Sequence, residues 1–532
     1  MATSDADGAG REGASGMVGE GGARDAETAR PGAAGSPRRL GFYQAADLAA
    51  QGGVDGLGVR RLALTPDGPV PSPTRETASP EGERAAGPVL SARAGVPQFA
   101  GGASARLIAP DIWWVGAGDK RLALFENAFP LTHGMEYNSY LIVDEKVVLV
   151  ETIDRAVSGQ FFENVSAVLG DRPVDYVVMN HAEPDHSATL GQVLARWPGA
   201  RLVCTGLGAK FAGQFFTPEL LERCVIAKEG DALLTGRHAL TFVEAPWVHW
   251  PEVMMSLDVA TGVLFSADAF GTFGALDGNV FADQMGGIDD DSRLAEYRRY
   301  YTNIVGKYGP YTSRALDKLA SADVAMLCPT HGPVWRRDLD RIIGKYATWA
   351  SYRPEDRAVA IFCASIYGGT ESAANMLAAR LSAAGVSDVR VYDVANTHSS
   401  YLLAEAFRCS HLVFASVTYN NGMFSAMRNL IADMGEHHMQ ARHVSFIENG
   451  TWHANSGKLM RQALAAMPDM VEVGEAVTLK STVSPESAAR IDALAISIAA
   501  SLRGDAAGAH ETRLSDPLPP VDTTSGASRK GH

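Results

Sequence analysis

The stretch from residue 180 to residue 187, NHAEPDHS, places four side chains that can ligate a metal within six residues: His181, Glu183, Asp185 and His186. It follows an apolar, β-branched run at 174–179, which predicts a buried strand, and precedes a helical pattern that begins near residue 188. A turn at the end of a strand can point imidazoles and carboxylates into one crevice. Alone, a short His- and Asp-rich turn is equally typical of a solvated connection.

Three further residues of ligand type also follow apolar runs. His249 lies among aromatic residues in the stretch APWVHWP (245–251), Asp268 follows a strand-like run at 262–266, and His331 follows another at 323–327. Each by itself is more typical of a hydrogen-bonded core or turn residue than of a ligand. Four such segments in one α/β region favour a binuclear metal site over four coincidences.

A second chemical pattern lies at 364–371, ASIYGGTE, between an apolar run at 359–363 and an amphipathic helical pattern. Backbone N–H groups and hydroxyls at the start of a helix bind phosphate well. The loop is not a Walker loop, because no Gly-Lys-Ser/Thr follows, and it is not the G-x-G-x-x-G dinucleotide motif. Polar loops also follow two later apolar runs, at 416–422 and 448–452.

The elements that must position these residues form two series. In the first, strand-like runs at 140–143, 147–150 and 174–179 alternate with turns and helical stretches as far as a helix expected at 338–349. Residues 353–356, RPED, look like a linker. In the second series, buried strands at 359–363, 389–391, 412–416 and 444–447 are separated by helical patterns. This spacing predicts an α/β protein whose second part is a doubly wound parallel sheet ending near residue 502.

The two ends of the chain have a different composition. The first hundred residues are rich in Gly, Ala, Pro, Ser and charged residues, and their only aromatics are Phe42, Tyr43 and Phe99. That is too little apolar surface to form a core. We therefore expect a disordered extension at 1–104, a metal-binding domain at 105–352, a second domain at 357–503, and a disordered tail at 504–532.

Composition excludes several classes of protein. A chain of 532 residues with 46% hydrophobic and 20% charged residues predicts two soluble folded domains. A net charge of −14 without Lys/Arg clusters argues against nucleic acid as a partner. The five scattered cysteines, without a C-x-x-C pair, argue against a disulfide framework, a zinc ribbon or a rubredoxin-type centre. We expect no signal peptide or membrane span, and a cytoplasmic location.

The metal motif resembles that of the metallo-β-lactamase superfamily, in which H-x-H-x-D-H is followed by a His, an Asp and a His. In this chain Glu183 replaces the second histidine, and the resulting H-x-E-x-D-H is the mark of the flavodiiron branch, also called A-type flavoproteins. Residues 134–142, GMEYNSYLI, also resemble that family's G-x-x-Y-N-S-Y-L-I segment, beside which His133 is a further pocket candidate. The resemblance covers about residues 105–503. It implies a β-lactamase-like αββα sandwich followed by a flavodoxin-like domain.

Four imidazoles and three carboxylates, shared between two metals with Asp268 as the bridge, would give each metal two histidines and one terminal carboxylate. Such a set leaves an open position and suits iron that cycles between ferrous and ferric states. Zinc has no redox chemistry and would support only hydrolysis. The resemblance implies that one iron is held by His181, Glu183 and His249, and the other by Asp185, His186 and His331.

The loop at 364–371 resembles the flavodoxin phosphate loop, S-x-Y-G-x-T-E in flavodiiron proteins, with Gly369 where Asn is common. Residues 416–422 resemble that family's S-P-T-x-N-N loop with Val417 in place of proline, and 448–452 take the place of its third loop. The resemblance implies a monophosphate flavin, FMN, with Tyr419 and Trp452 best placed to stack on its ring. The candidate FMN contacts are Ser365, Ile366, Tyr367, Gly368, Gly369, Thr370, Ser416, Val417, Thr418, Tyr419, Asn420, Asn421, Gly422, Asn449, Gly450, Thr451 and Trp452.

The resemblance implies an oxidoreductase in which FMN passes electrons to a di-iron site that reduces dioxygen to water, nitric oxide to nitrous oxide, or both. It implies no catalytic residue beyond the metal ligands. Two other functions stay open: a glyoxalase-like hydrolase of the metallo-β-lactamase superfamily, and a non-catalytic flavodoxin-type electron carrier. Glu183 and the flavin domain count against the hydrolase, and the seven ligand candidates count against the carrier.

Expected partners follow from the same resemblance. Without a C-x-x-C module we expect no fused rubredoxin, so a separate rubredoxin, a reduced deazaflavin or a flavin reductase would supply electrons. The resemblance also implies a head-to-tail homodimer, or a dimer of such dimers, in which the flavin of one chain feeds the irons of the other.

Overall fold

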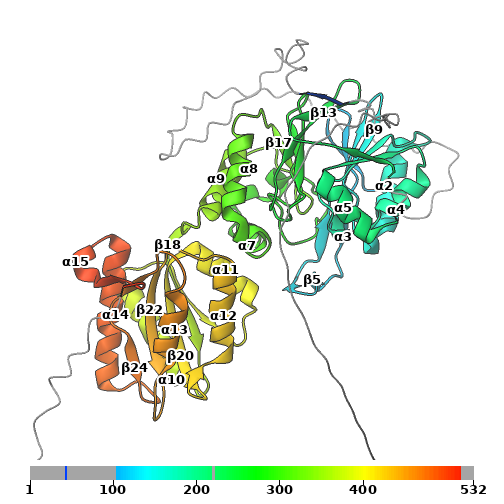
Figure 1. Cartoon of the computed structure of the whole chain (residues 1–532). Helices are drawn as coiled ribbons and strands as arrows, with labels where there is room; N and C mark the ends of the chain where they lie inside the picture. Colours follow the sequence, from blue (N-terminus) through cyan, green and yellow to red (C-terminus); the bar gives the residue numbers. More distant parts are fainter. Residues whose placement is uncertain (1–41, 45–102, 218–221, 517–532) are drawn as a thin grey trace, which may run out of the picture. The chain divides into compact units, whose positions relative to one another are not determined.

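The computed structural model describes residues 42–44, 103–217 and 222–516, and contains two α/β regions in sequence (Figure 1). The first region runs from strand β2 to helix α9, and the second from strand β18 to strand β25. Within the described residues, no helix is long and apolar enough to cross a membrane.

Two sheets form the first region, with the strand orders β12-β11-β10-β9-β8-β3-β2 and β1-β13-β14-β15-β16-β17. The strands of the first sheet are β2 (Arg106–Ala109), β3 (Ile112–Trp114), β8 (Tyr140–Val143), β9 (Val147–Val150), β10 (Tyr176–Val178), β11 (Arg201–Cys204) and β12 (Cys224–Ile226). Those of the second are β1 (Phe42–Gln44), β13 (Asp231–Leu234), β14 (Ala239–Glu244), β15 (Met254–Asp258), β16 (Val263–Phe265) and β17 (Met326–Cys328).

Alternation along these strands decides which side chains pack between the two sheets. In β8, Ile142 belongs to an inner cluster with Phe242 and Phe265 of the opposite sheet, whereas its neighbour Leu141 belongs to an outer cluster with Phe161. The helices that pack on the outer faces are α2 (Ser158–Leu169), α4 (Leu190–Arg196), α5 (Gly206–Phe215), α7 (Asp291–Tyr300), α8 (Gly309–Leu319) and α9 (Leu339–Ala350). The predicted αββα sandwich is confirmed.

The second region is one sheet with the order β19-β18-β20-β22-β23-β25, parallel except for β25. Its strands are β18 (Asp356–Ala364), β19 (Val389–Asp393), β20 (Cys409–Tyr419), β22 (His443–Asn449), β23 (Val471–Val473) and β25 (Glu511–Arg513), with β21 (Gly422–Met423) on β20 and β24 (Val477–Leu479) on β22. One face packs on α10 (Gly369–Ala383) and α14 (Pro485–Arg503), and the other on α11 (Ser399–Arg408), α12 (Ser425–Glu436) and α13 (Ser456–Leu464). This is the predicted flavodoxin-like doubly wound sheet.

Folded structure continues beyond the expected end of the second domain, so the prediction of a disordered tail from residue 504 is wrong for residues 504–516. Gly504 ends α14 in a left-handed conformation, α15 (Ala506–Ala509) follows, and β25 pairs antiparallel with β23. Leu514 is 8% exposed because its side chain packs under the sheet. A short polar stretch with one well-placed leucine carries too weak a periodic signal to be recognised as a strand. Residues 517–532 lie outside the described residues.

At the other end, residues 42–44 form β1, which pairs antiparallel with β13. The composition of residues 1–104 had predicted no folded element there. Residues 1–41 and 45–102 lie outside the described residues, so the expected disorder of the rest of the extension stays a prediction.

The expected linker at 353–356 is short and held in place. The side chain of Glu355 is buried and accepts hydrogen bonds from Arg298 and Lys345, and from the Trp349 indole at 3.0 Å. Although burial alone would raise the pKa of Glu355, the cations Arg298 and Lys345 lower it to about 2. The carboxylate therefore stays ionised and fixes the start of β18.

Candidate metal and flavin sites

The first ligand motif follows β10, which ends at Val178. Pro184 begins the short helix α3 (Pro184–Ser187), where its missing N–H costs nothing, and Glu183 is the residue before it. This tight turn brings His181 and Glu183 to one side and Asp185 and His186 to the other. His249, Asp268 and His331 reach the same place from loops of the opposite sheet, after β14, β16 and β17.

The seven predicted ligands fall into two groups. Within each group, the ligand atoms lie within 4.8 Å of one another. One group contains His181, Glu183, His249 and Asp268, and the other contains Asp185, His186 and His331. The structure therefore brings together the same residues that the family resemblance implied for each iron. His186 lies inside the second group.

Asp268 lies between the two groups. Its Oδ2 atom is 3.3 Å from His181 Nε2 and 3.1 Å from His249 Nε2 in the first group. Its Oδ1 atom is 3.0 Å from His186 Nε2 and 3.6 Å from His331 Nε2 in the second. One carboxylate thus presents one oxygen to each group, which is the arrangement that a bridging ligand needs.

The remaining contacts within each group are short. His249 Nε2 lies 3.0 Å from Glu183 Oε2, and His331 Nε2 lies 3.1 Å from Asp185 Oδ2. Both oxygens of Asp185 are buried, and among the described residues their close polar contacts are to the His331 and His186 Nε2 atoms of the same group. Buried carboxylate oxygens are normally paired, so this donor set fits cations held between the groups.

The charges of the site are mutually stabilised. Burial alone would raise the pKa of Asp268, but the surrounding histidines, His186 first, hold it well below its usual range. Burial alone would lower the pKa of His249, but its hydrogen bonds to Asp268 and Glu183 raise it to about 9. The field of the carboxylates therefore favours positive charge here, which a divalent cation supplies more strongly than protons do.

Two of the ligand histidines are oriented by contacts at their Nδ1 atoms. His181 Nδ1 lies 2.7 Å from Glu252 Oε1, and His331 Nδ1 lies 2.6 Å from the backbone oxygen of Glu136. Contacts of this kind fix the ring so that Nε2 faces the metal. Sequence reasoning missed Glu252 and Glu136. Glu252 stands three residues after His249, but nothing in that spacing tells that its carboxylate reaches His181 in a different loop.

Aromatic rings close the second group. Phe125, Tyr137 and Tyr300 each lie with ring centroids between 5.5 and 5.7 Å from the His331 ring. Phe125 belongs to the hairpin formed by β5 (Leu124–Phe125) and β6 (Phe129–Pro130). All three rings are buried, so this side of the second group is shielded from water. The weak pocket candidate His133 contributes only its backbone oxygen, to Ala275 N, among the contacts that the structure gives for it.

The first predicted flavin loop joins β18 to α10. Gly368 donates its N–H to Ser365 Oγ at 3.1 Å, and Gly368 has φ 84°, which glycine adopts without strain. A Cβ at Gly369 would lie 2.0 Å from the backbone oxygen of Ser481. This close approach explains glycine at a position where related loops carry Asn. Ile366 and Tyr367 project outward, and Tyr367 is 98% exposed.

The second predicted segment is a strand and turn rather than a loop. β20 continues through Val417 and Thr418 to Tyr419, and Asn420 and Asn421, with φ 50° and 57°, form the turn into β21. Two Asn residues in left-handed conformations are typical of a two-residue hairpin. The register along β20 puts Ser416 and Thr418 on one face of the strand, and Thr418 Oγ1 accepts hydrogen bonds from Asn455 N and Ser456 N.

The third segment follows β22. Asn449 is buried and donates from Nδ2 to Thr370 Oγ1 at 3.2 Å and to the Ser481 backbone oxygen at 3.1 Å. Gly450 and Thr451 continue the turn, and Trp452 is 90% exposed. Ser481, after β24, is a neighbour that sequence reasoning missed; its hydroxyl donates to Thr451 Oγ1 at 3.0 Å.

These three segments lie at the carboxyl ends of adjacent strands β18, β20 and β22. Ligands of doubly wound sheets bind at this edge. Tyr419, 51% exposed, and Trp452 offer flat apolar faces to a ring, and the loop before α10 offers N–H groups to a phosphate. The residues present therefore fit a flavin mononucleotide.

The fold and the two sites together define a β-lactamase-like metal domain followed by a flavodoxin-like domain. A model of the "ODP family beta lactamase" matches residues 135–332. The anaerobic nitric oxide reductase flavorubredoxin of Aeromonas hydrophila is 34% identical over 331 residues, which cover 61% of this chain and 65% of the relative. The protein of the same name from Vibrio vulnificus is 31% identical over 357 residues, covering 65% of this chain and 70% of the relative. The chain thus spans about two thirds of the length of these relatives.

Solved structures with a similar fold point to the same family. Rubredoxin oxygen:oxidoreductase from Desulfovibrio gigas superposes with a TM-score of 0.69 at 27% identity, covering 75% of this chain and 99% of that one. The flavodiiron protein of Giardia intestinalis has the same fold, with a TM-score of 0.68 at 20% identity, covering 77% of this chain and 98% of that one. This chain belongs to the flavodiiron protein family. Its cofactors are accordingly FMN and a pair of irons.

Proposed function

We propose that this chain reduces nitric oxide to nitrous oxide, with electrons that FMN delivers to two irons held by the seven ligand residues. The observation that carries the proposal is the position of Asp268, which offers one oxygen to each ligand group. Two metals a carboxylate apart can hold two nitric oxide molecules side by side. The names of the Aeromonas and Vibrio relatives support nitric oxide as the substrate.

The reaction consumes two electrons and two protons: two nitric oxide molecules give one nitrous oxide and one water. When bound, the irons supply redox chemistry and open coordination positions. The chain's own residues orient the ligand histidines and exclude bulk water. Glu252 and the Glu136 backbone hold His181 and His331, and the wall of Phe125, Tyr137 and Tyr300 keeps bulk water away from the second group.

Dioxygen is the second candidate substrate, because the same pair of metal positions suits it and the Desulfovibrio gigas neighbour bears the name of an oxygen reductase. An anaerobic stopped-flow experiment decides between the two. The fully reduced protein is mixed with nitric oxide or with dioxygen, and flavin oxidation is followed together with nitrous oxide formation. Faster oxidation by nitric oxide with one nitrous oxide per two electrons supports the proposal. Oxidation by dioxygen alone overturns it.

The hydrolase and electron-carrier alternatives have less support. A glyoxalase-like hydrolase with zinc or iron would need no flavin, and a carrier would need no ligand set. Metal analysis tests both, because the proposal requires about two irons and one FMN per chain. Stoichiometric zinc without iron, together with hydrolytic activity, would contradict the redox function.

We also propose that the working unit is a head-to-tail homodimer or a dimer of such dimers. Trp247, which precedes the ligand His249 by two residues, is 36% exposed and stacks on Tyr308. An aromatic surface therefore borders the first ligand group. The flavin segments expose Tyr367 and Trp452 in turn. A second copy would place one surface against the other. Mixed dimers of an iron-deficient chain (His331→Ala with Asp268→Ala) and a flavin-deficient chain (Thr370→Ala with Trp452→Ala) should retain one working site. Inactive mixed dimers would place transfer within one chain.

We propose that a separate rubredoxin, a reduced deazaflavin or a flavin reductase donates the electrons. We also propose that the protein is located in the cytoplasm. Each donor is tested by its rate of flavin reduction under anaerobic conditions. A donor that reduces the flavin no faster than buffer is excluded.

A further inference from the structure

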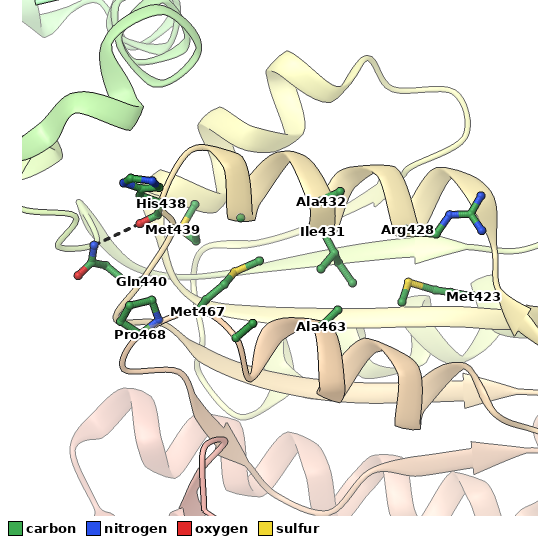
Figure 2. Close-up of a pocket in the computed structure, with 12 residues that line it drawn as sticks. Met423, Arg428, Ile431, Ala432, His438, Met439, Gln440, Ala463, Met467 and Pro468 are labelled. Atoms are coloured by element: carbon green, nitrogen blue, oxygen red, sulfur yellow. Dashed lines mark hydrogen bonds between the residues drawn. The ribbon is translucent and has the colours of Figure 1, made fainter. Parts of the chain in front are cut away.

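An apolar groove of about 590 Å³ lies between α12 and the end of α13 on one face of the second region (Figure 2). Its floor is formed by Ile431 and Met467, which are 2% and 8% exposed. Ala432 of α12 and Ala463 of α13 also line it, and both side chains are short (Figure 2). The groove lies outside both the metal ligands and the predicted flavin contacts.

The two ends of the groove differ. Met423 and Arg428 lie at one end, and Gln440 and Pro468 lie at the other (Figure 2). Arg428 forms no ion pair with any residue inside the described ranges. An apolar channel that ends in an unpaired guanidinium suits an apolar segment with a carboxylate at one end.

The described chain ends beside the Pro468 end of this groove. Leu514 donates its N–H to the Met470 backbone oxygen at 2.9 Å, and Met470 is two residues from Pro468. The Leu514 side chain is buried in the same cluster as Met467, which is part of the groove floor. The described chain therefore ends next to the face of the sheet that carries the groove.

The sequence that follows has the right composition and length. Residues 517–521 read PLPPV, and Asp522 follows. Prolines lose little conformational entropy on docking, and Leu518 and Val521 supply apolar side chains. In a polyproline conformation five residues extend roughly 16 Å. The part of α12 from Arg428 to its end at Glu436 is about 12 Å long. The segment is therefore long enough to span the groove and would bring Asp522 to Arg428 if it lay there.

We propose that residues 517–521 occupy this groove within their own chain, with Asp522 paired to Arg428. The segment then covers an apolar surface that would otherwise be open to a second copy or to another protein. It also fixes β25, the edge strand from which it leaves.

The test places the photo-crosslinker p-benzoylphenylalanine at Leu518 in the full-length holoprotein, with the same probe at Ser528 as control. After irradiation, mass spectrometry should find the Leu518 probe joined to α12 or to residues 463–468. Equal mixtures of heavy- and light-isotope protein should give crosslinks within one chain only. Crosslinks between heavy and light chains, or to sites away from the groove, overturn the proposal.

A charge swap gives an independent check. Arg428→Asp should greatly reduce the crosslink, and adding Asp522→Arg in the same chain should restore it. Asn429→Asp, on the exposed side of the same helix, is the matched control and should leave the crosslink unchanged. No restoration in the double variant contradicts the pairing. Because none of these residues belongs to the metal or flavin sites, gas turnover should be unaffected and is scored separately.

Discussion

The metal site and the flavin site are built in opposite ways. The metal ligands are buried and already in contact with one another: Asp268 is 1% exposed and touches both groups. The flavin segments expose their aromatic rings, with Trp452 at 90%. A metal site must pay for burying charge by pairing every charge, so its geometry is fixed by the protein itself. A planar flavin ring needs only flat faces and loop N–H groups, so binding of the flavin itself can order the exposed aromatic rings.

The largest effect expected from this contrast is at the bridge. Asp268→Ala should remove both irons and abolish turnover, because its carboxylate contacts both groups. His186→Ala removes a ligand from the second group only and should retain part of the iron. Iron content by metal analysis and gas turnover measure both variants. Circular dichroism of the Asp268→Asn variant checks the fold, and equal iron contents in the Asp268 and His186 variants would mean that Asp268 is not the bridge.

The next effect concerns a residue that touches no metal. Glu252→Ala should weaken iron binding about 10- to 100-fold, the usual loss when the group behind a metal-binding histidine is removed. Glu252→Gln is the matched control: it keeps an oxygen to accept from His181 Nδ1 and should retain more affinity. Competition with a chelator measures both. A Glu252→Ala variant that holds iron as tightly as the parent would show that His181 needs no support.

The connection between the two regions should respond to pH. Because Arg298 and Lys345 lower the pKa of buried Glu355 to about 2, its contribution to stability is present above the ordinary carboxyl range. It is lost as the pH falls from about 5 toward 2. A shift of this size corresponds to about 3 kcal/mol. Glu355→Gln should lose stability at pH 7 and approach the parent near pH 3, as urea unfolding would measure. A constant difference between pH 7 and pH 3 would contradict the assignment.

The smallest effect is expected at the flavin. Trp452→Ala should weaken FMN binding by about 1 kcal/mol, roughly fivefold, because one stacking face is lost while the loop contacts remain. The melting temperature of the apoprotein should not change, since the indole is exposed. Ile496→Ala, an exposed apolar residue on α14, is the control. A loss of fold in the Trp452 variant would remove the contrast between the two sites.

Local pattern predicted the strands well where apolar runs were continuous. The runs at 140–143 and 147–150 are the strands β8 and β9, residue for residue. It failed where a segment is ordered by its neighbours. Leu514 packs under the sheet from a polar stretch, and Ser416 and Val417 continue β20 because β22 pairs with them. Such pairing is a long-range contact, and a single sequence has no local signal for it.

The sequence by itself determined the ligand types and the family. Seven His, Asp and Glu residues at the ends of apolar runs favoured two metals, and the resemblance of the H-x-E-x-D-H motif and the flavin loops to flavodiiron proteins implied redox chemistry. The tertiary structure decided the positions: Asp268 between two groups, Glu252 behind His181, Gly369 against the Ser481 backbone. The physical reason is that side-chain type follows from the chain alone. The distances between loops are set by packing two sheets and their helices around a common core.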